Sequence, residues 1–318
     1  MTTASAPGKV ILCGEHAVVY GYPAIALPLP DVRAHATVED APRGAGITLD
    51  TPDVSESWRL DEAQPHPLAT LVRLTFETLG IVTPLDLHIT LRSTIPIARG
   101  MGSGAALGAA LVKALAAHLG ARLDPGTLSR LVYESERFYH GTPSGIDNTV
   151  VSYEQAIWFV RGQQGAGQAA LPTIEPIRIG APFALVIGDT GVYAPTHITV
   201  GGVRERWQGA PERYNALFGE IGQVVTAIRG KLADGDLVAL GGALNRNQEL
   251  LQALGVSVPA LETLIDAALA AGALGAKLSG GGGGGIMLAL AEVAQRETVA
   301  RALLKAGAAH VSHTVVIS

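Results

Sequence analysis

The chain has 318 residues, of which 48% are hydrophobic and 16% are charged, and its formal net charge is −5. This length supplies enough apolar surface for one large domain or two ordinary ones. The acidic balance offers no basic field to a nucleic-acid backbone, and lysine and arginine form no local cluster. We therefore expect a globular protein that has no nucleic acid as a partner.

Cysteine content and hydropathy bear on location. Cys13 is the one cysteine of the chain, so an internal disulfide is excluded. The N-terminus lacks the basic region and following apolar run of a secretory signal. No stretch reaches the roughly 18 to 20 consecutive apolar residues that cross a bilayer. These features predict a cytoplasmic protein without a membrane partner.

The first third of the chain is rich in β-like segments. Residues 5–21 open with a short apolar strand, and Lys9, Glu15 and His16 form a compact polar group that could also be an ordinary solvated turn. Segments between residues 24 and 60 alternate with Pro/Gly turns, which predicts a small sheet. Two further elements are predicted, a helix at 67–79 and a period-two strand at 85–91.

A glycine loop and a helix follow this strand, within residues 95–119. Gly100, Gly102 and Gly104 are spaced two apart, so the backbone can curl and turn its N–H groups toward one point. An alanine- and leucine-rich helix comes next, and its N-terminus would favour a phosphate. The pattern is neither a Walker A motif nor a full G-x-G-x-x-G. A tight turn between a closely packed strand and helix is the alternative.

Two carboxylates lie beyond the central helix. A second helix is predicted from Asp124-Pro125 to about residue 139, and Glu136 borders its apolar stripe. That position suggests either a ligand or a salt-bridged glutamate, for example with Arg137. Residues 140–149 are predicted as a turn that ends at Asp147 before an apolar strand; an Asx-turn or a helix cap is the alternative role of Asp147.

The second half of the chain is more helical. Residues 161–168 read as an exposed hairpin tip or a linker. The predicted elements are strands at 183–187, 286–290 and 314–317, and helices over most of 198–271. Six consecutive glycines, 280–285, follow Lys277 and open directly onto a core strand. Either they are a flexible linker, or they form a loop of backbone donors over a ligand.

Four segments, residues 6–21, 95–106, 140–148 and 277–285, resemble the motifs of the GHMP kinase family, in the family's order. The resemblance implies an α+β, two-domain GHMP kinase fold. The N-terminal domain, residues 1–175, would resemble domain 2 of ribosomal protein S5. The C-terminal domain, residues 176–318, would be a ferredoxin-like α+β domain, and the active site would lie in the cleft between the two domains.

The resemblance also implies an activity, the ATP-dependent phosphorylation of a small alcohol. Residues 14–19 and 140–148 are most similar to the branch of the family that phosphorylates (R)-mevalonate on its 5-hydroxyl. The implied partners are ATP and mevalonate, the implied cofactor is Mg²⁺, and a homodimer, common in the family, stays open. Three alternatives also stay open: a phosphomevalonate or mevalonate diphosphate decarboxylase, a kinase of another alcohol, and a catalytically silent nucleotide-binding protein.

Residue roles follow from the matched positions. Asp147 would act as base toward the 5-hydroxyl of mevalonate, with Lys9 beside it and beside the transferring phosphoryl group, and Glu136 would bind Mg²⁺. The other implied contacts are Glu15, His16, Thr196 and Gly281 with mevalonate, and Arg99, Gly100, Met101, Gly102, Ser103, Gly104 and Ala105 with the nucleotide phosphates.

One position of the phosphate loop departs from the family. The family usually has Gly-Leu-Gly-Ser-Ser-Ala, whereas this chain has Gly at position 104 in place of the second serine. If that serine is the usual metal ligand, either Ser103 takes its role or water fills the site, since Mg²⁺ readily keeps several waters.

Overall fold

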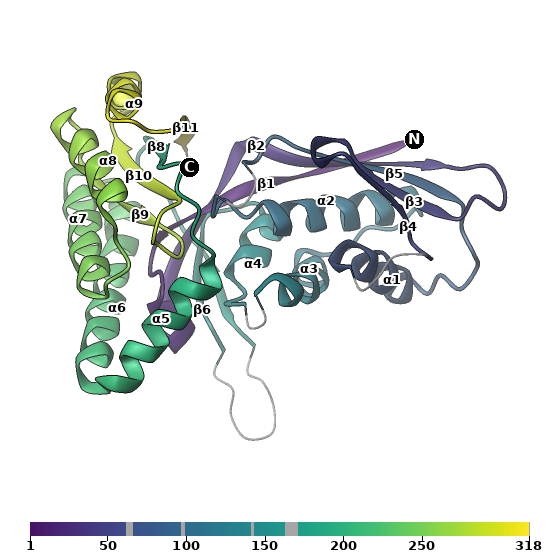
Figure 1. Ribbon diagram of the computed structural model, residues 1–318, viewed down its shortest axis with the longest axis horizontal. Helices are drawn as coiled ribbons and strands as arrows, with labels where there is room; N and C mark the ends of the chain where they lie inside the picture. The colour runs from purple at the N-terminus through teal and green to yellow at the C-terminus, as the bar shows by residue number, and fades with distance from the viewer. Residues whose placement is uncertain (62–65, 97–98, 141–142, 163–170, 318) are drawn as a thin grey trace. The chain divides into compact units, whose positions relative to one another are not determined.

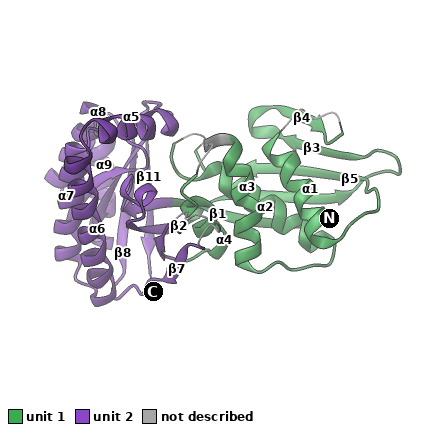
Figure 2. Ribbon diagram, turned by 90° about the horizontal axis from the view of Figure 1, so that it is seen from below, with its two compact units in different colours: residues 1–9, 28–155 green, residues 10–27, 156–318 purple. Residues whose placement is uncertain are grey.

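The computed structural model describes residues 1–61, 66–96, 99–140, 143–162 and 171–317. It divides into two compact units, coloured green and purple in Figure 2: unit 1 holds residues 1–9 and 28–155, and unit 2 holds residues 10–27 and 156–318. Strands β1 (Thr2–Cys13) and β2 (Pro23–Asp40) contribute residues to both units. The domain boundary predicted at residues 175 and 176 concerns the family domains and stays a prediction.

The sheet of unit 1 is the small sheet that the sequence predicts. Its strands lie in the order β4-β3-β5-β2, where β3 and β5 are parallel and the other pairs antiparallel. The new strands are β3 (Ile47–Thr51), β4 (Glu56–Arg59) and β5 (Leu87–Ser93), with a 3-10 turn, η2, at Pro52–Val54. The apolar residues that alternate along β5 are buried, as the period-two pattern requires.

Four helices lie along one side of this sheet (Figure 1). They are α1 (Pro67–Leu79), α2 (Ser103–His118), α3 (Pro125–His140) and α4 (Ile146–Tyr153). Ten residues of α2 are buried, because its alanines and glycines let neighbouring helices approach closely. A Cβ on Gly108 would lie 2.8 Å from Cδ1 of Leu71 in α1. The predicted helices at 67–79, after the glycine loop and from 125 onward are confirmed.

The strand that the sequence predicts after Asp147 is wrong, because this segment is helix α4. Thr149, Val150 and Val151 are β-branched and favour a strand intrinsically. Gly145, with φ 90°, starts a helix instead, and Val150 and Val151 are fully buried where α4 contacts α2 and α3. Tertiary packing thus overrides local propensity here.

Unit 2 is built on an antiparallel sheet in the order β11-β8-β10-β9. Its strands are β8 (Phe183–Asp189), β9 (Gly275–Ser279), β10 (Ile286–Ala291) and β11 (His310–Val316). The helices are α5 (Thr196–Gly209), α6 (Pro211–Asp234), α7 (Leu237–Ala253), α8 (Pro259–Ala270) and α9 (Arg296–Lys305). Chain order and strand order together are those of a ferredoxin-like β-α-β-β-α-β arrangement, which confirms the predicted C-terminal fold.

Shorter elements complete unit 2. In this unit β2 pairs with β6 (Ile157–Val160), which pairs with β7 (Thr173–Pro176), and both pairings are antiparallel. Two 3-10 turns are η1 (Ala17–Tyr20) and η3 (Val293–Gln295). Most of the stretch 161–168, predicted as a hairpin tip or linker, lies outside the described residues. Within the described ranges, no helix combines the length and apolar character that crossing a membrane requires.

Strand β9 lies at one edge of its sheet, and helix α7 covers that edge. The side-chain oxygen of Asn245 accepts a hydrogen bond from the amide of Ala276 at 2.8 Å. The side-chain oxygen of Gln248 accepts one from the amide of Leu278 at 3.0 Å. Two carboxamides of α7 therefore satisfy backbone donors that no neighbouring strand pairs.

Candidate active site

The glycine loop of unit 1 packs directly on Lys9. The backbone amide of Lys9 donates to the carbonyl of Met101 at 3.0 Å. Gly100 and Gly102 have φ of 79° and 71°, a region that side chains rarely adopt. A Cβ on Gly102 would also lie 2.8 Å from Cγ of Lys9. Glycine at 102 is thus needed both for the turn and for the approach of the lysine stem.

Lys9 forms an ion pair with Asp147. The Lys9 ammonium lies 2.9 Å from Oδ1 of Asp147; Lys9 is 3% exposed and Asp147 27%. Asp147 stands in the first turn of α4, whose N-cap is Gly145, so its carboxylate is not the cap. Asn148 anchors the same turn by donating to the carbonyl and hydroxyl oxygens of Ser129 in α3. The ion pair therefore has a fixed cation and a carboxylate that solvent reaches.

Glu136 is a third ionisable group of this region. It is 3% exposed, and the pKa of its carboxyl is raised to about 8. Burial is the main cause, the like charge of Asp147 adds to it, and Lys9 opposes both. The salt bridge suggested between Glu136 and Arg137 is not found, because the Arg137 guanidinium pairs with the Glu134 carboxylate, one helical turn away, at 2.9 Å.

These carboxylates suit a hard divalent cation. A buried carboxyl whose proton is retained by burial and by a neighbouring negative charge is one that a cation would stabilise. Across the parts of the chain that the structure describes, no three or more His, Cys, Asp or Glu side chains form a group able to hold a metal ion. A metal bound here would complete its shell with water, a hydroxyl or phosphate oxygens, as Mg²⁺ does.

The start of α2 has the features of a phosphate-binding site. Ser103 is the first residue of this 16-residue helix, followed by Gly104 and Ala105. The amides of a first helical turn have no intrahelical acceptors, and the helix dipole adds positive potential there. Arg99 precedes Gly100 in the same loop, whereas residues 97–98 lie outside the described part of the chain. The predicted phosphate loop thus adjoins Lys9 as a structural unit.

Unit 2 holds a second charged pair. The Lys277 ammonium donates to the carboxylate of Glu15 and, at 2.5 Å, to the carbonyl of Leu278. Lys277 is 0% and Glu15 1% exposed. Burial, reinforced by the Glu15 charge, raises the pKa of the nearby Cys13 thiol, which makes the thiol unreactive. The sequence motifs did not predict this role of Lys277. The position of a lysine within an otherwise apolar strand could have indicated it.

His16 connects this pair to the six glycines. Its Nε2 lies 3.0 Å from the carbonyl of Gly281. Burial is the main reason that the pKa of His16 is lowered to about 4, so the ring is neutral at pH 7. Because a carbonyl oxygen only accepts, Nε2 carries the proton and Nδ1 is left as an acceptor. His16 also has φ 60°, a strained value for a residue with a side chain.

The six glycines form an ordered turn between β9 and β10, so their interpretation as a flexible linker is wrong. The amides of Gly283 and Gly285 donate to the carbonyls of Val256 and Val192 at 2.7 and 2.9 Å. Five of the six have positive φ, namely Gly280, Gly282, Gly283, Gly284 and Gly285. Only backbone without side chains can adopt this path.

Gly281 lies beside two threonines of α5. A Cβ on Gly281 would lie 2.7 Å from Oγ1 of Thr199 and 3.3 Å from Cγ2 of Thr196. The four predicted substrate contacts, Glu15, His16, Thr196 and Gly281, are therefore linked by contacts within unit 2. Thr199 was not predicted, and no motif marks it. In the predicted turn at 140–149, the side chain of His140 and residues 141–142 lie outside what the structure describes.

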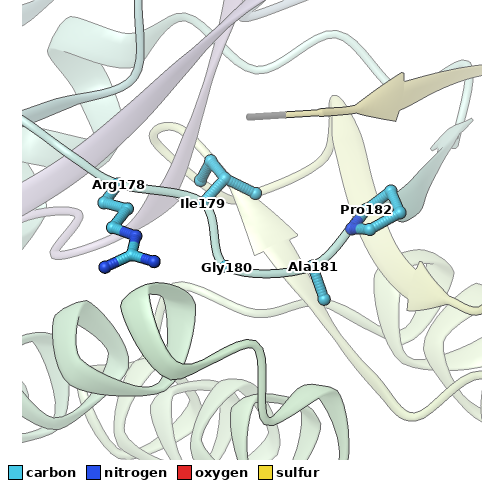
Figure 3. Close-up of a pocket in the computed structure, with 5 residues that line it drawn as sticks. All are labelled: Arg178, Ile179, Gly180, Ala181 and Pro182. Carbon is cyan, nitrogen blue, oxygen red and sulfur yellow. The ribbon is translucent and has the colours of Figure 1, made fainter.

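One hollow of unit 2 plays no part in this arrangement. Residues 178–182 line it (Figure 3), and none of them belongs to the four motifs. The segment packs on the end of α6, where the amide of Gly180 donates to the carbonyl of Leu232 at 2.7 Å. A Cβ on Gly180 would lie 2.4 Å from the carbonyl oxygen of Ala233, so the glycine is required by packing.

Comparison with known proteins defines the class. The profile of the GHMP kinases N terminal domain matches residues 68–155, and that of the GHMP kinases C terminal region matches residues 228–309. The chain belongs to the GHMP kinase family.

Its relatives at 30% identity or more include mevalonate kinases. The chain is 34% identical to the mevalonate kinase of Pyrococcus furiosus, over 96% of this chain and 93% of that protein. It is 30% identical to the mevalonate kinase of Arabidopsis thaliana, over 90% of each chain. The crystal structure of L. major mevalonate kinase in complex with R-mevalonate superposes with a TM-score of 0.83 and 28% identity, over 99% of this chain and 96% of that one. The predicted two-domain GHMP kinase fold is confirmed.

Proposed function

We propose that this protein transfers the γ-phosphoryl group of ATP to the 5-hydroxyl of (R)-mevalonate, which yields 5-phosphomevalonate and ADP, a step of isoprenoid biosynthesis. The observation that carries the proposal is the Lys9–Asp147 pair, 2.9 Å apart and held on a phosphate-binding glycine loop, in a chain that is 34% identical to a mevalonate kinase over 96% of its length. A cation, a base and a phosphate cradle are the parts that phosphoryl transfer needs.

Asp147 is the base in this proposal. The 5-hydroxyl oxygen forms a bond to the γ-phosphorus while the bond between that phosphorus and the β–γ bridging oxygen breaks, and the hydroxyl proton passes to the Asp147 carboxylate. The carboxylate is 27% exposed, so an alcohol can reach it. Lys9 holds the base in place and offsets the negative charge of the transferring group.

The nucleotide phosphates bind at the glycine loop. Arg99 to Ala105 supply backbone amides and positive potential at the start of α2. Glu136 and Ser103 are the proposed ligands of Mg²⁺, and water is the alternative to Ser103 as replacement for the hydroxyl that Gly104 lacks. When bound, the metal supplies positive charge to the phosphate oxygens.

Residues of unit 2 recognise the alcohol in this proposal. The Nδ1 atom of His16 is free to accept a hydrogen bond from a substrate hydroxyl, because its Nε2 is used by Gly281. Thr196, at the start of α5, is exposed beside the glycine turn. Glu15 is a proposed contact whose carboxylate is oriented by Lys277.

The test is the mass of the products formed with Mg·ATP from (R)-mevalonate and, in a parallel reaction, from mevalonate 5-phosphate. We expect a gain of one phosphoryl group in the first reaction and no change in the second. Release of carbon dioxide, phosphorylation in the second reaction only, or no ADP from either would contradict the proposal. We also propose a cytoplasmic location and a homodimer, and light scattering tests the second of these.

A further inference from the structure

Helix α4, which carries Asp147 in its first turn, ends on an unusual residue. Glu154 follows the helix with φ 52°, in the left-handed region that favours glycine. Helices α1 and α6 end in the same conformation on Gly80 and Gly235, where no side chain is strained. A glutamate at such a position costs backbone energy, which points to a compensating role of its carboxylate.

The Glu154 carboxylate binds two cations. Its Oε1 accepts from Lys113 of α2 at 2.5 Å, and its Oε2 accepts from Arg33 of β2 at 2.8 Å. Partial burial by itself raises the pKa of Glu154, but the hydrogen bonds from Lys113 and Arg33 outweigh it and leave the pKa below its usual value. The group is therefore a carboxylate, fixed by one cation on each oxygen.

Both cations also bind strand β1. The Lys113 ammonium donates to the carbonyl of Ser5 at 2.9 Å, and Nε of Arg33 donates to the Ser5 hydroxyl at 3.0 Å. Ser5, Arg33, Lys113 and Glu154 thus form one connected group within unit 1, here termed the Glu154 brace. It joins the C-terminal end of α4 to β1 through α2 and β2.

Three elements carry a reacting group at one point and a brace residue at another. On β1, Ser5 lies four residues before Lys9, about 13 Å along a strand. On α4, Glu154 lies seven residues after Asp147, about 10 Å along a helix. On α2, Lys113 lies ten residues after Ser103 of the phosphate loop, about 15 Å away.

We propose that Glu154 is a positioning residue, which through Lys113, Arg33 and Ser5 sets the distance and angle between the elements that carry Asp147, Lys9 and the phosphate loop. The Lys9–Asp147 contact ties α4 to β1 at one point, the first turn of the helix, while α4 otherwise packs on α2 and α3. The brace adds a second tie to β1 about 10 Å along the helix, and two ties fix the direction of α4 relative to that strand. Transfer geometry is sensitive to displacements of about 1 Å.

The test compares two substitutions at one position. Glu154→Gln keeps the size of the side chain and removes its charge; Glu154→Gly removes the brace but also removes the backbone strain. For both we expect kcat to fall by about 5- to 100-fold, with KM for ATP and mevalonate within about twofold of wild type. A mere helix cap predicts the opposite for glycine, a kcat equal to or above that of wild type with a higher melting temperature.

Two further variants sharpen the result. Lys113→Met is expected to lower kcat similarly, and Lys113→Met/Glu154→Gln no more than either alone, because both act through one group. The matched control is Glu134→Gln, which removes an exposed glutamate–arginine pair on α3 and is expected to leave kcat unchanged. Wild-type kcat in both Glu154 variants, or full additivity with Lys113→Met, overturns the proposal.

This inference rests on the proposed function, so a second measurement is needed that does not depend on turnover. Hydrogen exchange of the amides of residues 150–153 is expected to be faster in Glu154→Gln and Lys113→Met than in Glu134→Gln. If wild type fails to phosphorylate mevalonate, the proposed function fails while exchange still tests the brace. If wild type is active and exchange in α4 is unchanged, the brace fails while the function stands.

Discussion

Each unit contains a lysine–carboxylate pair beside a glycine-rich turn, and the two pairs differ in access. In unit 1 the carboxylate of the Lys9–Asp147 pair is 27% exposed. In unit 2 the Glu15–Lys277 pair is sealed, with 1% and 0% exposed. A group that exchanges a proton with a substrate has to be reachable, whereas a sealed pair acts through the structure that it holds. The open pair therefore fits the proposed reaction, and in the sealed pair Lys277 would hold the Glu15 carboxylate in place for its proposed contact.

The largest effect is expected from the open pair. Asp147→Asn removes the acceptor of the hydroxyl proton while an amide oxygen remains to bind Lys9, so we expect kcat to fall by roughly 10² to 10⁴. Nucleotide affinity, measured by calorimetry, should change little. Near-normal kcat would remove the assignment of Asp147 as base.

The sealed pair should respond in stability. Lys277→Met removes the cation that the buried Glu15 carboxylate binds, and we expect the free energy of unfolding to fall by about 3–5 kcal/mol. Adding Glu15→Gln should recover at least half of that loss, because an amide is cheaper to bury than a charge. Urea unfolding of the three proteins measures both effects. A loss below about 1 kcal/mol in Lys277→Met would show that the pair is not structural.

Glu136 lies between these cases, buried yet next to the open pair. The fold raises the pKa of Glu136 from its ordinary value of 4.5 to about 8. The stability that the protonated carboxyl contributes is therefore fully present below pH 4.5 and is lost as the pH rises through 8. Glu136→Gln stays neutral, and at pH 8.5 we expect it to stabilise the metal-free protein by about 1–3 kcal/mol.

The control for this comparison is the exposed Glu134→Gln, and the readout is the difference in melting temperature between pH 4.5 and pH 8.5. The difference between Glu136→Gln and wild type should vanish at the lower pH. The same variant should need more Mg²⁺ for half-maximal activity. Parallel pH profiles of wild type and variant would contradict the raised pKa.

The smallest effect is expected at the ordered glycine turn. In Gly281→Ala the new methyl meets Oγ1 of Thr199 at 2.7 Å, so the turn shifts and KM for mevalonate should rise by about 3- to 10-fold. Thr199→Ala in the same chain makes room and should restore part of the affinity. Gly201→Ala, which meets nothing within 4 Å, is the control. If Gly281→Ala leaves KM unchanged, the turn does not contact the substrate.

Patterns local in sequence predicted much of the fold. The period-two strand now seen as β5 and the helices that became α1, α2 and α3 are set by neighbours within a few turns of chain. The segment after Asp147 was predicted as a strand because Val150 and Val151 favour one, and only their burial against other helices makes it helical. A single sequence does not show such contacts.

The sequence likewise predicted the site residues that lie in motifs but not the contacts between residues distant in the chain. The family motifs placed Lys9, Asp147 and Glu136 together, and the structure brings these groups together within unit 1. The partner of Glu15 is 262 residues away in sequence, at Lys277. No spacing rule identifies such a pair. Glu154 was also missed, because a left-handed glutamate has no signature in sequence.

The edge of the unit 2 sheet has a consequence for the protein at high concentration. An unpaired strand edge is a template on which another chain can add a strand, the first step toward aggregation. Asn245 and Gln248 of α7 already occupy the amides of Ala276 and Leu278 on β9. The same edge strand leads into the glycine turn, so blocking it also keeps a second chain away from the residues proposed to bind substrate.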